Sequence, residues 1–266
     1  MRSTGDAPSA RRVDAASGPR SADDASRLGR ALSDVLGFVL IFGIVVSTVA
    51  VVYVGGFDAL TEARDVQRFD NAERAFDVLD ANVEDLALRG APSRATEIRL
   101  ADASIGFGPP VSFNVTTESG RWYQRSIRPI VYRTDDGSEL VYANGALFRQ
   151  YGDRAVMFDP PRIITGNRTL IPLVATDDAS SGVSALDTRR LLVRTQVSGR
   201  NVARFENAKA NLTITSPRAS AWERYLEDDV GLTCTGPEDG VSGEVTCRLP
   251  PGDVYIQDVS VAVSFT

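Results

Sequence analysis

The residues with the most evident chemistry are the chain's two cysteines, Cys234 and Cys247. Cysteines at this separation either form a disulfide or contribute to a metal site, and one isolated pair is more typical of a disulfide. Twelve residues lie between them, and Gly236, Pro237 and Gly240 supply turns between two strand-like runs, GLTCT and EVTCRL. Facing strands would bring the two Cα atoms within about 7 Å, which a disulfide requires. The spacing therefore predicts a disulfide between Cys234 and Cys247.

Three Asn-x-Thr triplets, at Asn114, Asn167 and Asn211, are candidate acceptors for N-linked glycans. Asn114 and Asn211 lie in runs of alternating character, VSFNVTT and NLTITS, where the apolar residues would share one face of a strand and turn the asparagine to the other. We expect these two to be modified more readily than Asn167. The alternative is that all three are ordinary surface asparagines.

No set of residues typical of catalysis is evident in the sequence. Histidine is absent, which removes the usual general base near neutral pH and the commonest zinc ligand. The sequence also contains neither a phosphate-binding glycine loop with lysine nor a Gly-x-Ser-x-Gly motif. Asp135, Asp136 and Glu139, or Asp177 with Asp178, could hold calcium, but neither group has the spacing of a known calcium loop. We therefore expect a protein that is not an enzyme and has no cofactor and no metal site.

The charge balance excludes one class of partner. The net charge is −6, and Lys209 is the only lysine among 29 basic residues, the other 28 being arginines. Surfaces rich in Asp, Glu and Arg are typical of halophilic proteins, although a GC-rich genome also replaces lysine by arginine. An acidic chain without a basic stripe is not expected to bind nucleic acid.

The elements that would position these residues start from one apolar stretch, residues 35–57. It holds 23 residues without a charge, and as a helix it would extend about 34 Å, enough for a hydrocarbon core of about 30 Å. A single segment can satisfy its backbone in a membrane only as a helix. We therefore predict a transmembrane helix over residues 32–57 and membrane lipid as a partner. A buried core helix of a soluble protein is the alternative.

A polar leader, residues 1–31, precedes this stretch. It is rich in Ser, Ala, Gly, Pro, Arg and Asp, and we predict that it is disordered because it has little apolar surface to bury. Its end, RALSDVLG, resembles the class III signal of archaeal type IV pilins and archaellins. The resemblance implies that a prepilin peptidase recognises Arg30 and cuts between Ala31 and Leu32 on the cytoplasmic side. The apolar helix would then remain in the mature protein.

The resemblance also bears on Asp34, which stands where such signals commonly carry proline. If the chain assembles with other pilin-like subunits, the Asp34 carboxylate could pair with a neighbour's new amino terminus. Ordinary capping of the helix by Ser33 and Asp34 is the simpler alternative. Leu36 occupies the fifth mature position, where bacterial pilins carry glutamate, and this difference favours a minor subunit over a major one.

Residues 58–90 are predicted to continue the span as an amphipathic helix, because apolar residues recur there every three or four positions. Gly90 and Pro92 would end it. From residue 91 to residue 266 the apolar period changes to two, with many short runs separated by turn residues and a hairpin signal at Asn144-Gly145. One short helix is expected near 217–228, starting with Ser216 as cap. The fold class predicted is α+β, a long helix followed by a sandwich-like, extracytoplasmic β domain.

A second resemblance covers residues 30–105. The runs NAERAFDVL and RGAPSRATEIRLADA are similar to an uncharacterised group of pilin-like membrane proteins of halophilic archaea. Together, the resemblances imply a single-pass protein of the cell membrane with its N-terminus in the cytoplasm and its C-terminal domain outside. The implied function is a non-catalytic, minor pilin-like subunit of a type IV pilus-related surface structure. The alternative is a membrane-anchored surface or sensor protein that does not polymerise.

Overall fold

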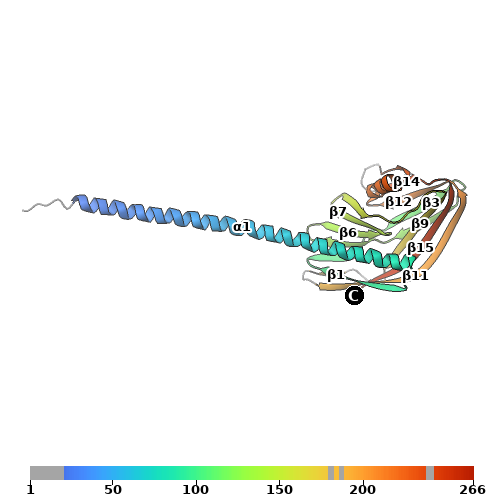
Figure 1. Cartoon of the computed structure of the whole chain (residues 1–266), viewed down its shortest axis with the longest axis horizontal. Coiled ribbons are helices and arrows are strands. Elements are labelled where there is room, and N and C mark those ends of the chain that lie inside the picture. Colours follow the sequence, from blue (N-terminus) through green and yellow to red (C-terminus); the bar gives the residue numbers. More distant parts are fainter. Residues whose placement is uncertain (1–20, 179–182, 186–188, 238–242) are drawn as a thin grey trace, which may run out of the picture. The chain divides into compact units, whose positions relative to one another are not determined.

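The computed structural model describes residues 21–178, 183–185, 189–237 and 243–266, and of residues 21–34 it describes the helical backbone alone. A long helix, α1, is followed by strands β1 to β15, with a short helix, α2, and a π-helical turn, η1, between β12 and β13 (Figure 1). The chain divides into two compact units, one ending at Arg64 and one spanning Asp65–Thr266. This arrangement confirms the predicted α+β class with a sandwich-like β domain.

Helix α1 (Ser21–Leu88) begins at Ser21 and not at Leu32. The prediction of disorder is therefore wrong for residues 21–31, while residues 1–20 lie outside the described part of the chain. The segment SADDASRLGRA contains good helix formers, and its early aspartates favour the positive end of a helix. Extending an existing helix also adds one hydrogen bond per residue without a new nucleation cost.

The last five turns of α1 are built into the β domain. Ala72, Phe76, Leu79, Val83 and Leu86, all from the predicted apolar stripe, are buried. The helix ends as the sequence predicted: Gly90 adopts a φ of 77°, and the backbone N–H groups of Arg89 and Ala91 both donate to the Asp85 carbonyl. The tertiary structure thus uses the last five turns of the helix as a core element.

The strands are short and numerous, as the change of period predicted. Their bounds are β1 (Ser93–Leu100), β2 (Ala103–Phe107), β3 (Val111–Thr117), β4 (Trp122–Ile127), β5 (Ile130–Thr134), β6 (Ser138–Ala143), β7 (Ala146–Tyr151), β8 (Arg154–Asp159), β9 (Arg168–Asp178), β10 (Val183–Ala185), β11 (Arg189–Ala208), β12 (Ala210–Ser216), β13 (Thr233–Thr235), β14 (Gly243–Arg248) and β15 (Gly252–Phe265).

Strand boundaries differ from the sequence prediction where the backbone bends. The run TEIRLADASIGF is divided between β1 and β2 at Asp102, whose φ is 50°. The run RIITG forms only an isolated bridge between Ile164 and Leu170. Conversely, the 20-residue strand β11 joins the strand-like run RRLLVRTQVSG to the first part of VARFENAKANLTITS, whose remainder forms β12. Strand β11 stays paired across bulges near Gly199 and Ala208. The Asn144-Gly145 hairpin between β6 and β7 is confirmed, with φ values of 56° and 71°.

The strands form three sheets with the orders β1-β11-β15-β9, β10-β2-β5-β6-β7-β8 and β13-β14-β12-β3-β4. Neighbouring strands are antiparallel except β15 and β9, which are parallel and therefore need a long connection. The burial pattern of β15 changes phase along its length: Val254 and Ile256 are buried on one face, and Val259, Val261 and Val263 on the other. The first sheet therefore contributes to two cores.

We call these the helix core and the sheet core. The helix core places the buried stripe of α1 against the first two sheets; its members include Phe76, Leu79, Ile98, Tyr132, Val193 and Val261. The sheet core is formed by residues of all three sheets and of α2; its members include Phe113, Phe148, Leu212, Trp222, Val245 and Ile256. Trp222 is fully buried, with Phe113 and Phe148 ring centroids at 5.3 and 5.5 Å.

The short helix is found close to its predicted place. Helix α2 spans Ala219–Arg224, and η1 (Tyr225–Asp229) continues it. The Ser216 side chain does not cap the helix, because its Oγ accepts from the Arg218 N–H at 3.0 Å and Arg218 occupies the cap position. The helix thus begins two residues later than the sequence predicted.

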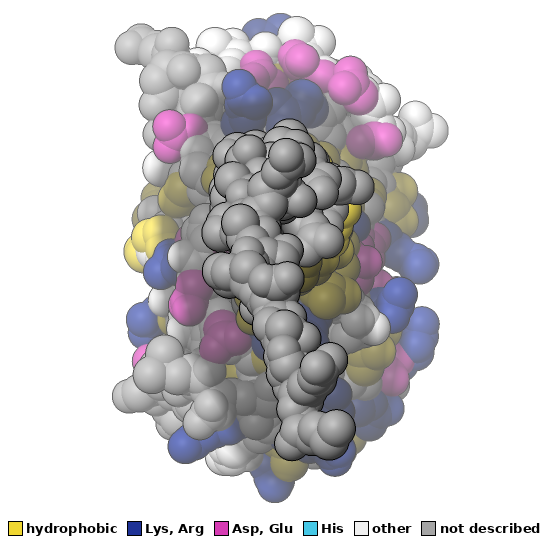
Figure 2. Space-filling view, turned by 90° about the vertical axis from the view of Figure 1, so that its left-hand side faces the viewer, with side chains coloured by type: hydrophobic (Ala, Val, Ile, Leu, Met, Phe, Trp, Pro, Cys, Tyr) yellow, Lys and Arg dark blue, Asp and Glu magenta, His cyan; other side chains and the backbone are white. Residues whose placement is uncertain are grey.

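The charged surface is mixed in sign. Figure 2 shows basic and acidic side chains side by side on one face of the β domain. Many charged side chains of the β domain form ion pairs, such as Arg68–Asp102 at 2.8 Å and Arg204–Asp253 at 2.8 Å. Such exposed pairs add little stability individually, so this pattern is mainly a property of the solvated surface.

Candidate functional site

The residues of the predicted cleavage motif, Arg30, Ala31 and Leu32, lie on the backbone of α1, as does Asp34. Their side chains are outside the described part of the chain, so the predicted processing and assembly roles stay predictions. The structure places all four within a continuous helix that starts nine residues before Arg30.

Directly after this motif, α1 carries a segment long and apolar enough to cross a membrane. It spans Val35–Tyr53, with a mean hydropathy of 2.8, and none of it is buried within the protein. It is the one helix of this kind among the described residues. A buried core helix, the alternative considered from the sequence, would be covered by protein. The segment is therefore an apolar surface that the chain itself leaves uncovered.

The glycan-acceptor triplets are brought together in a way the sequence did not reveal. Asn114 lies on β3 and Asn211 on the adjacent β12, and in the antiparallel register each asparagine is paired with the other triplet's threonine: Asn114 with Thr213, and Asn211 with Thr116. Both asparagines face away from the sheet core, as the alternation predicted. Asn167 is exposed just before β9. All three are thus sterically accessible for modification.

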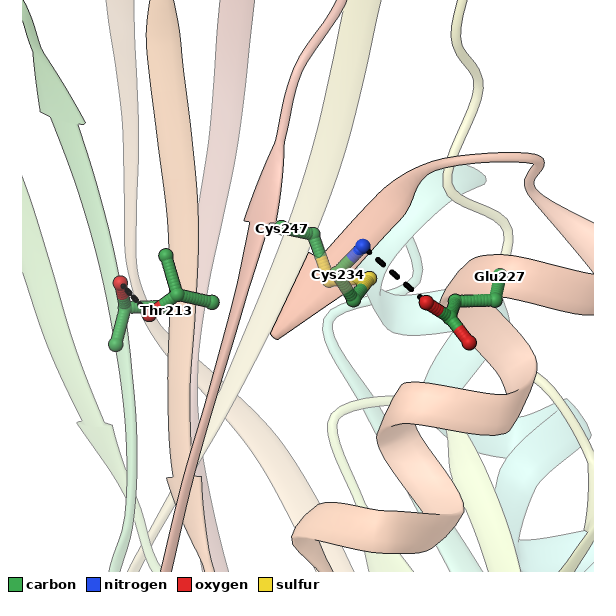
Figure 3. Close-up of a disulfide and its surroundings, with 5 residues drawn as sticks. Thr213, Glu227, Cys234 and Cys247 are labelled. Atoms are coloured by element: carbon green, nitrogen blue, oxygen red, sulfur yellow. Dashed lines mark hydrogen bonds between the residues drawn. A yellow bond between two sulfur atoms is a disulfide. The ribbon is translucent and has the colours of Figure 1, made fainter. Parts of the chain in front are cut away.

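The disulfide between Cys234 and Cys247 is present and joins directly opposed residues of β13 and β14. The two Cα atoms are 4.0 Å apart. Figure 3 shows the bond beside η1, where the Glu227 carboxylate accepts from the Cys234 N–H at 3.3 Å. The prediction is confirmed, and the bond fixes the edge strand β13 to the third sheet.

The acidic groups considered for calcium are engaged in other contacts. Asp136 accepts from the Ser138 N–H and hydroxyl within its turn, while Glu139 pairs with Arg133 at 2.6 Å and with buried Arg218 at 3.3 Å. Asp178 pairs with Arg128 at 3.2 Å. Among the described residues, no three acidic or cysteine side chains lie close enough to share a metal ion.

A pocket in the β domain is the feature that sequence reasoning missed. It lies where the last turns of α1 meet the β6–β7 hairpin and the segment that follows β8. Its polar lining consists of Asp80 and Glu84 from α1, Tyr142 and Asn144 from the hairpin region, Asp159 from the end of β8, and Arg162 from the segment that follows. Prolines 160, 161 and 172 form part of its walls.

Three carboxylates share this pocket with one guanidinium group. Burial is the largest cause of a raised pKa at Asp80, followed by repulsion from the carboxylates of Asp159, Glu84 and Asp77. Together they raise the pKa of Asp80 to about 7, while the positive charge of Arg162 lowers it. Arg162 approaches Glu84 at 3.7 Å but is largely exposed. Asp80 is thus poised between its neutral and charged forms at physiological pH.

Two donors at the pocket lack acceptors. The Tyr142 side chain is fully buried and Asn144 is 1% exposed. The Tyr142 oxygen accepts from the Gly145 N–H, but its hydroxyl proton has no acceptor among the described residues. The Asn144 amide nitrogen also has no acceptor there, although Asn144 Oδ1 accepts from the Val174 N–H at 2.7 Å. Burial chiefly raises the pKa of Tyr142, and the charge on Asp80 raises it further. Perturbed groups gathered in a pocket are typical of a binding site.

Part of this site has a signal in the sequence. Asp80 follows Leu79 directly on the amphipathic helix, and Asn144 belongs to the hairpin turn that the sequence predicted. Nothing in the sequence, however, joins these two positions to the Asp159–Arg162 segment. Their proximity depends on how α1 packs against the second sheet.

Fold and sites together define an α+β protein with one apolar helix suited to crossing a membrane and a disulfide-linked β domain. The chain belongs to a family of unknown function, DUF7289, whose model matches residues 30–264. The match starts at Arg30 and so includes the apolar helix and almost the whole β domain. No curated protein and no solved structure matches the chain significantly.

Proposed function

We propose that this protein is a non-catalytic, minor pilin-like subunit of a type IV pilus-related cell-surface structure. The observation that carries the proposal is the order of three features along one helix: the cleavage motif Arg30-Ala31-Leu32, the charge-free segment Val35–Tyr53, and the buried stripe from Ala72 to Leu86. Removal of a polar leader would free an apolar helix whose other end is fixed in a folded domain. Such a helix can exchange lipid for contacts with other subunits.

The surface of the apolar segment supports close packing between helices. Gly37 and Gly43 lie on it, and a Cβ placed at either of them would meet no atom within 4 Å other than those of the adjoining helix backbone. Small residues let helix backbones approach, and van der Waals packing then supplies the association because lipid is as apolar as the helix. The proposed partners are membrane lipid and other pilin-like subunits, with a prepilin peptidase acting first.

The β domain supports an orientation with the C-terminus outside the cell. A disulfide such as Cys234–Cys247 is stable in an oxidising compartment, and the triplets at Asn114 and Asn211 face solvent, where glycan transfer is sterically possible. The proposal therefore includes a cytoplasmic N-terminus and an extracellular glycoprotein domain of archaeal type. Asp34 would pair with the new amino terminus of a neighbouring subunit during assembly.

The deciding measurement is the intact mass of the full chain extracted from its native membrane. We expect a mass lacking residues 1–31, and we expect Ala31→Trp to leave the leader in place while the control Ala16→Trp, within the leader, does not. Cross-linking should recover other pilin-like subunits, and Asp34→Asn should lower that recovery while leaving membrane insertion unchanged. Retention of the leader in the unmodified protein would refute processing.

One observation favours the alternative, a membrane-anchored surface or sensor protein that does not polymerise. Helix α1 continues through Arg30, Ala31 and Leu32 from Ser21, and a helical backbone is a poorer protease substrate than an exposed, irregular one. In that case residues 1–31 would persist and the apolar helix would serve only as an anchor. A mature mass that includes residues 1–31, together with cross-links to lipid but to no pilin-like subunit, would establish this alternative.

A further inference from the structure

We propose that the pocket lined by Asp80, Tyr142, Asn144 and Asp159 binds a small zwitterion, a molecule with an ammonium group and a carboxylate, of the size of glycine or alanine. The inference does not depend on the proposed function, since all of its residues lie in the β domain unit, Asp65–Thr266. It follows from two complementary properties of the pocket: carboxylates without a cation and buried donors without an acceptor.

The acidic side of the pocket needs a cation. Asp80, Glu84 and Asp159 face it, and only Glu84 forms an ion pair with Arg162, at 3.7 Å. Among the described residues, neither Asp80 nor Asp159 forms an ion pair. Their repulsion is relieved in the empty pocket by protonation of Asp80, whose pKa lies at about 7. An ammonium group between Asp80 and Asp159 would replace that proton and satisfy both carboxylates.

The hairpin residues of the pocket need an acceptor. The Tyr142 O–H and the Asn144 NH₂ are buried donors without partners. The orientation of the Asn144 amide is fixed, because its oxygen accepts from the Val174 N–H at 2.7 Å, which leaves the nitrogen for the pocket. A carboxylate could accept from both donors, and Arg162 lies on the same lining to add a third contact.

Size and donor type narrow the ligand further. The pocket has a volume of 160 Å³, close to the cavity of about 150 Å³ that holds a six-carbon ring in another protein. Glycine and alanine are of that size. A metal ion alone would leave the Tyr142 and Asn144 donors unsatisfied, and no three of the described carboxylates are placed to share one. An organic ammonium without a carboxylate would leave the same donors unpaired.

The test is isothermal titration of the full chain in detergent micelles with glycine and alanine, with methylammonium and acetate as probes that carry one charge each. We expect binding of the amino acids at least about tenfold tighter than of either single-charge probe, since each loses a hydrogen bond to a charged group. At pH 7 binding should release a proton from Asp80, so the heat should differ between buffers of different ionisation enthalpy. The groups that face Asp80 are Asp159, Glu84 and Asp77, Arg162 and Tyr142.

Two variants separate the two halves of the site. Tyr142→Phe removes the hydroxyl proton that has no acceptor in the free protein, so it should weaken amino-acid binding about tenfold. Urea denaturation of the same variant shows whether loss of the acceptor for the Gly145 N–H affects the fold. Asp80→Asn should weaken binding similarly and abolish the proton release, whereas Asp70→Asn, on the exposed face of the same helix, should do neither. The proposal is overturned if no amino acid binds at about 10 mM, well above a weak Kd of about 1 mM. It is also overturned if methylammonium binds as tightly as glycine.

Discussion

The two cores of the β domain are assembled in different ways. The helix core is completed by a segment remote in sequence from most of its strands, the stripe Ala72–Leu86 of α1, which covers two sheets. The sheet core contains no residue of α1 and is formed by strands, α2 and the disulfide-linked edge. The first core therefore couples the β domain to the helix that carries the apolar segment, and the second is independent of it.

The two cores should therefore differ in how strongly their packing depends on α1. Phe76 meets Tyr132 with ring centroids 6.4 Å apart, whereas Trp222 contacts Phe113, Phe148 and Tyr225 at 5.3, 5.5 and 6.3 Å. Both side chains are fully buried. Loss of α1 packing should loosen the side chains of the helix core, such as Tyr132, while leaving the cluster around Trp222 in place.

The largest effect should come from truncating the central aromatic of each core. Phe76→Ala and Trp222→Ala should each lower the free energy of unfolding by about 3–5 kcal/mol. Because the two side chains belong to separate cores, the double variant should show the sum of both effects within about 0.5 kcal/mol. Urea denaturation of the full chain in micelles measures this. A strongly non-additive double variant would mean that the two cores behave as one.

Breaking the disulfide should have the next largest effect, confined to the sheet core. Replacing Cys234 and Cys247 together by alanine should cost about 3 kcal/mol, the chain-entropy value for a loop of this length. Hydrogen exchange should increase in β13 and β14 and stay unchanged in α1. Equal loss of protection in α1 would contradict the independence of the sheet core.

An effect of intermediate size is expected from pH, because the free energy of unfolding should depend on the titration of Asp80 on α1. The pKa of Asp80 is raised from 3.8 to about 7 by burial and by the carboxylates of Asp159, Glu84 and Asp77, with Arg162 opposing. A raised folded-state pKa favours the folded state below pH 3.8, and this advantage is lost as the pH rises to about 7. Asp80→Asn should therefore be more stable than the parent at pH 8, by about 1–3 kcal/mol.

The same variant provides the control for that prediction. The stability difference between Asp80→Asn and the parent should shrink on going from pH 8 to pH 5 and should be absent below the unfolded-state pKa. Thermal unfolding of both proteins in matched buffers at these values measures it. A difference that does not change with pH would mean that packing, and not titration of Asp80, distinguishes the two proteins.

The smallest effect on stability is expected outside both cores, at the N-terminal end of the apolar stripe predicted for residues 58–90. Leu60 belongs to the predicted stripe but is 61% exposed, so Leu60→Ala should change the free energy of unfolding by less than about 0.5 kcal/mol. The matched change Leu79→Ala, at a fully buried position, should cost about 2–5 kcal/mol. Similar costs for both leucines in the isolated chain would show that α1 is packed beyond Ala72.

The candidate sites differ in how far local sequence defines them. The disulfide was predictable because Cys234 and Cys247 flank a turn-rich loop, and short loops restrict which strands can pair. The outward direction of Asn114 and Asn211 was predictable because side chains alternate along a strand. That their two triplets are paired across β3 and β12 was not, because nearly 100 residues separate them and pairing depends on register.

The sequence by itself determined the elements: the apolar period of α1, the change to period two after Pro92, the Asn144-Gly145 hairpin and the end of the helix at Gly90. These features follow from local backbone preferences and side-chain spacing. Where α1 begins was not determined locally, since residues 21–31 are helical in continuity with the segment that follows. Only the tertiary structure decided that Ala72–Leu86 is buried while Leu60 is not, and that Asp80, Tyr142, Asn144 and Asp159 share one pocket. The physical reason is that burial and raised pKa values depend on which surfaces come together in space, and packing of α1 against the sheets sets that arrangement.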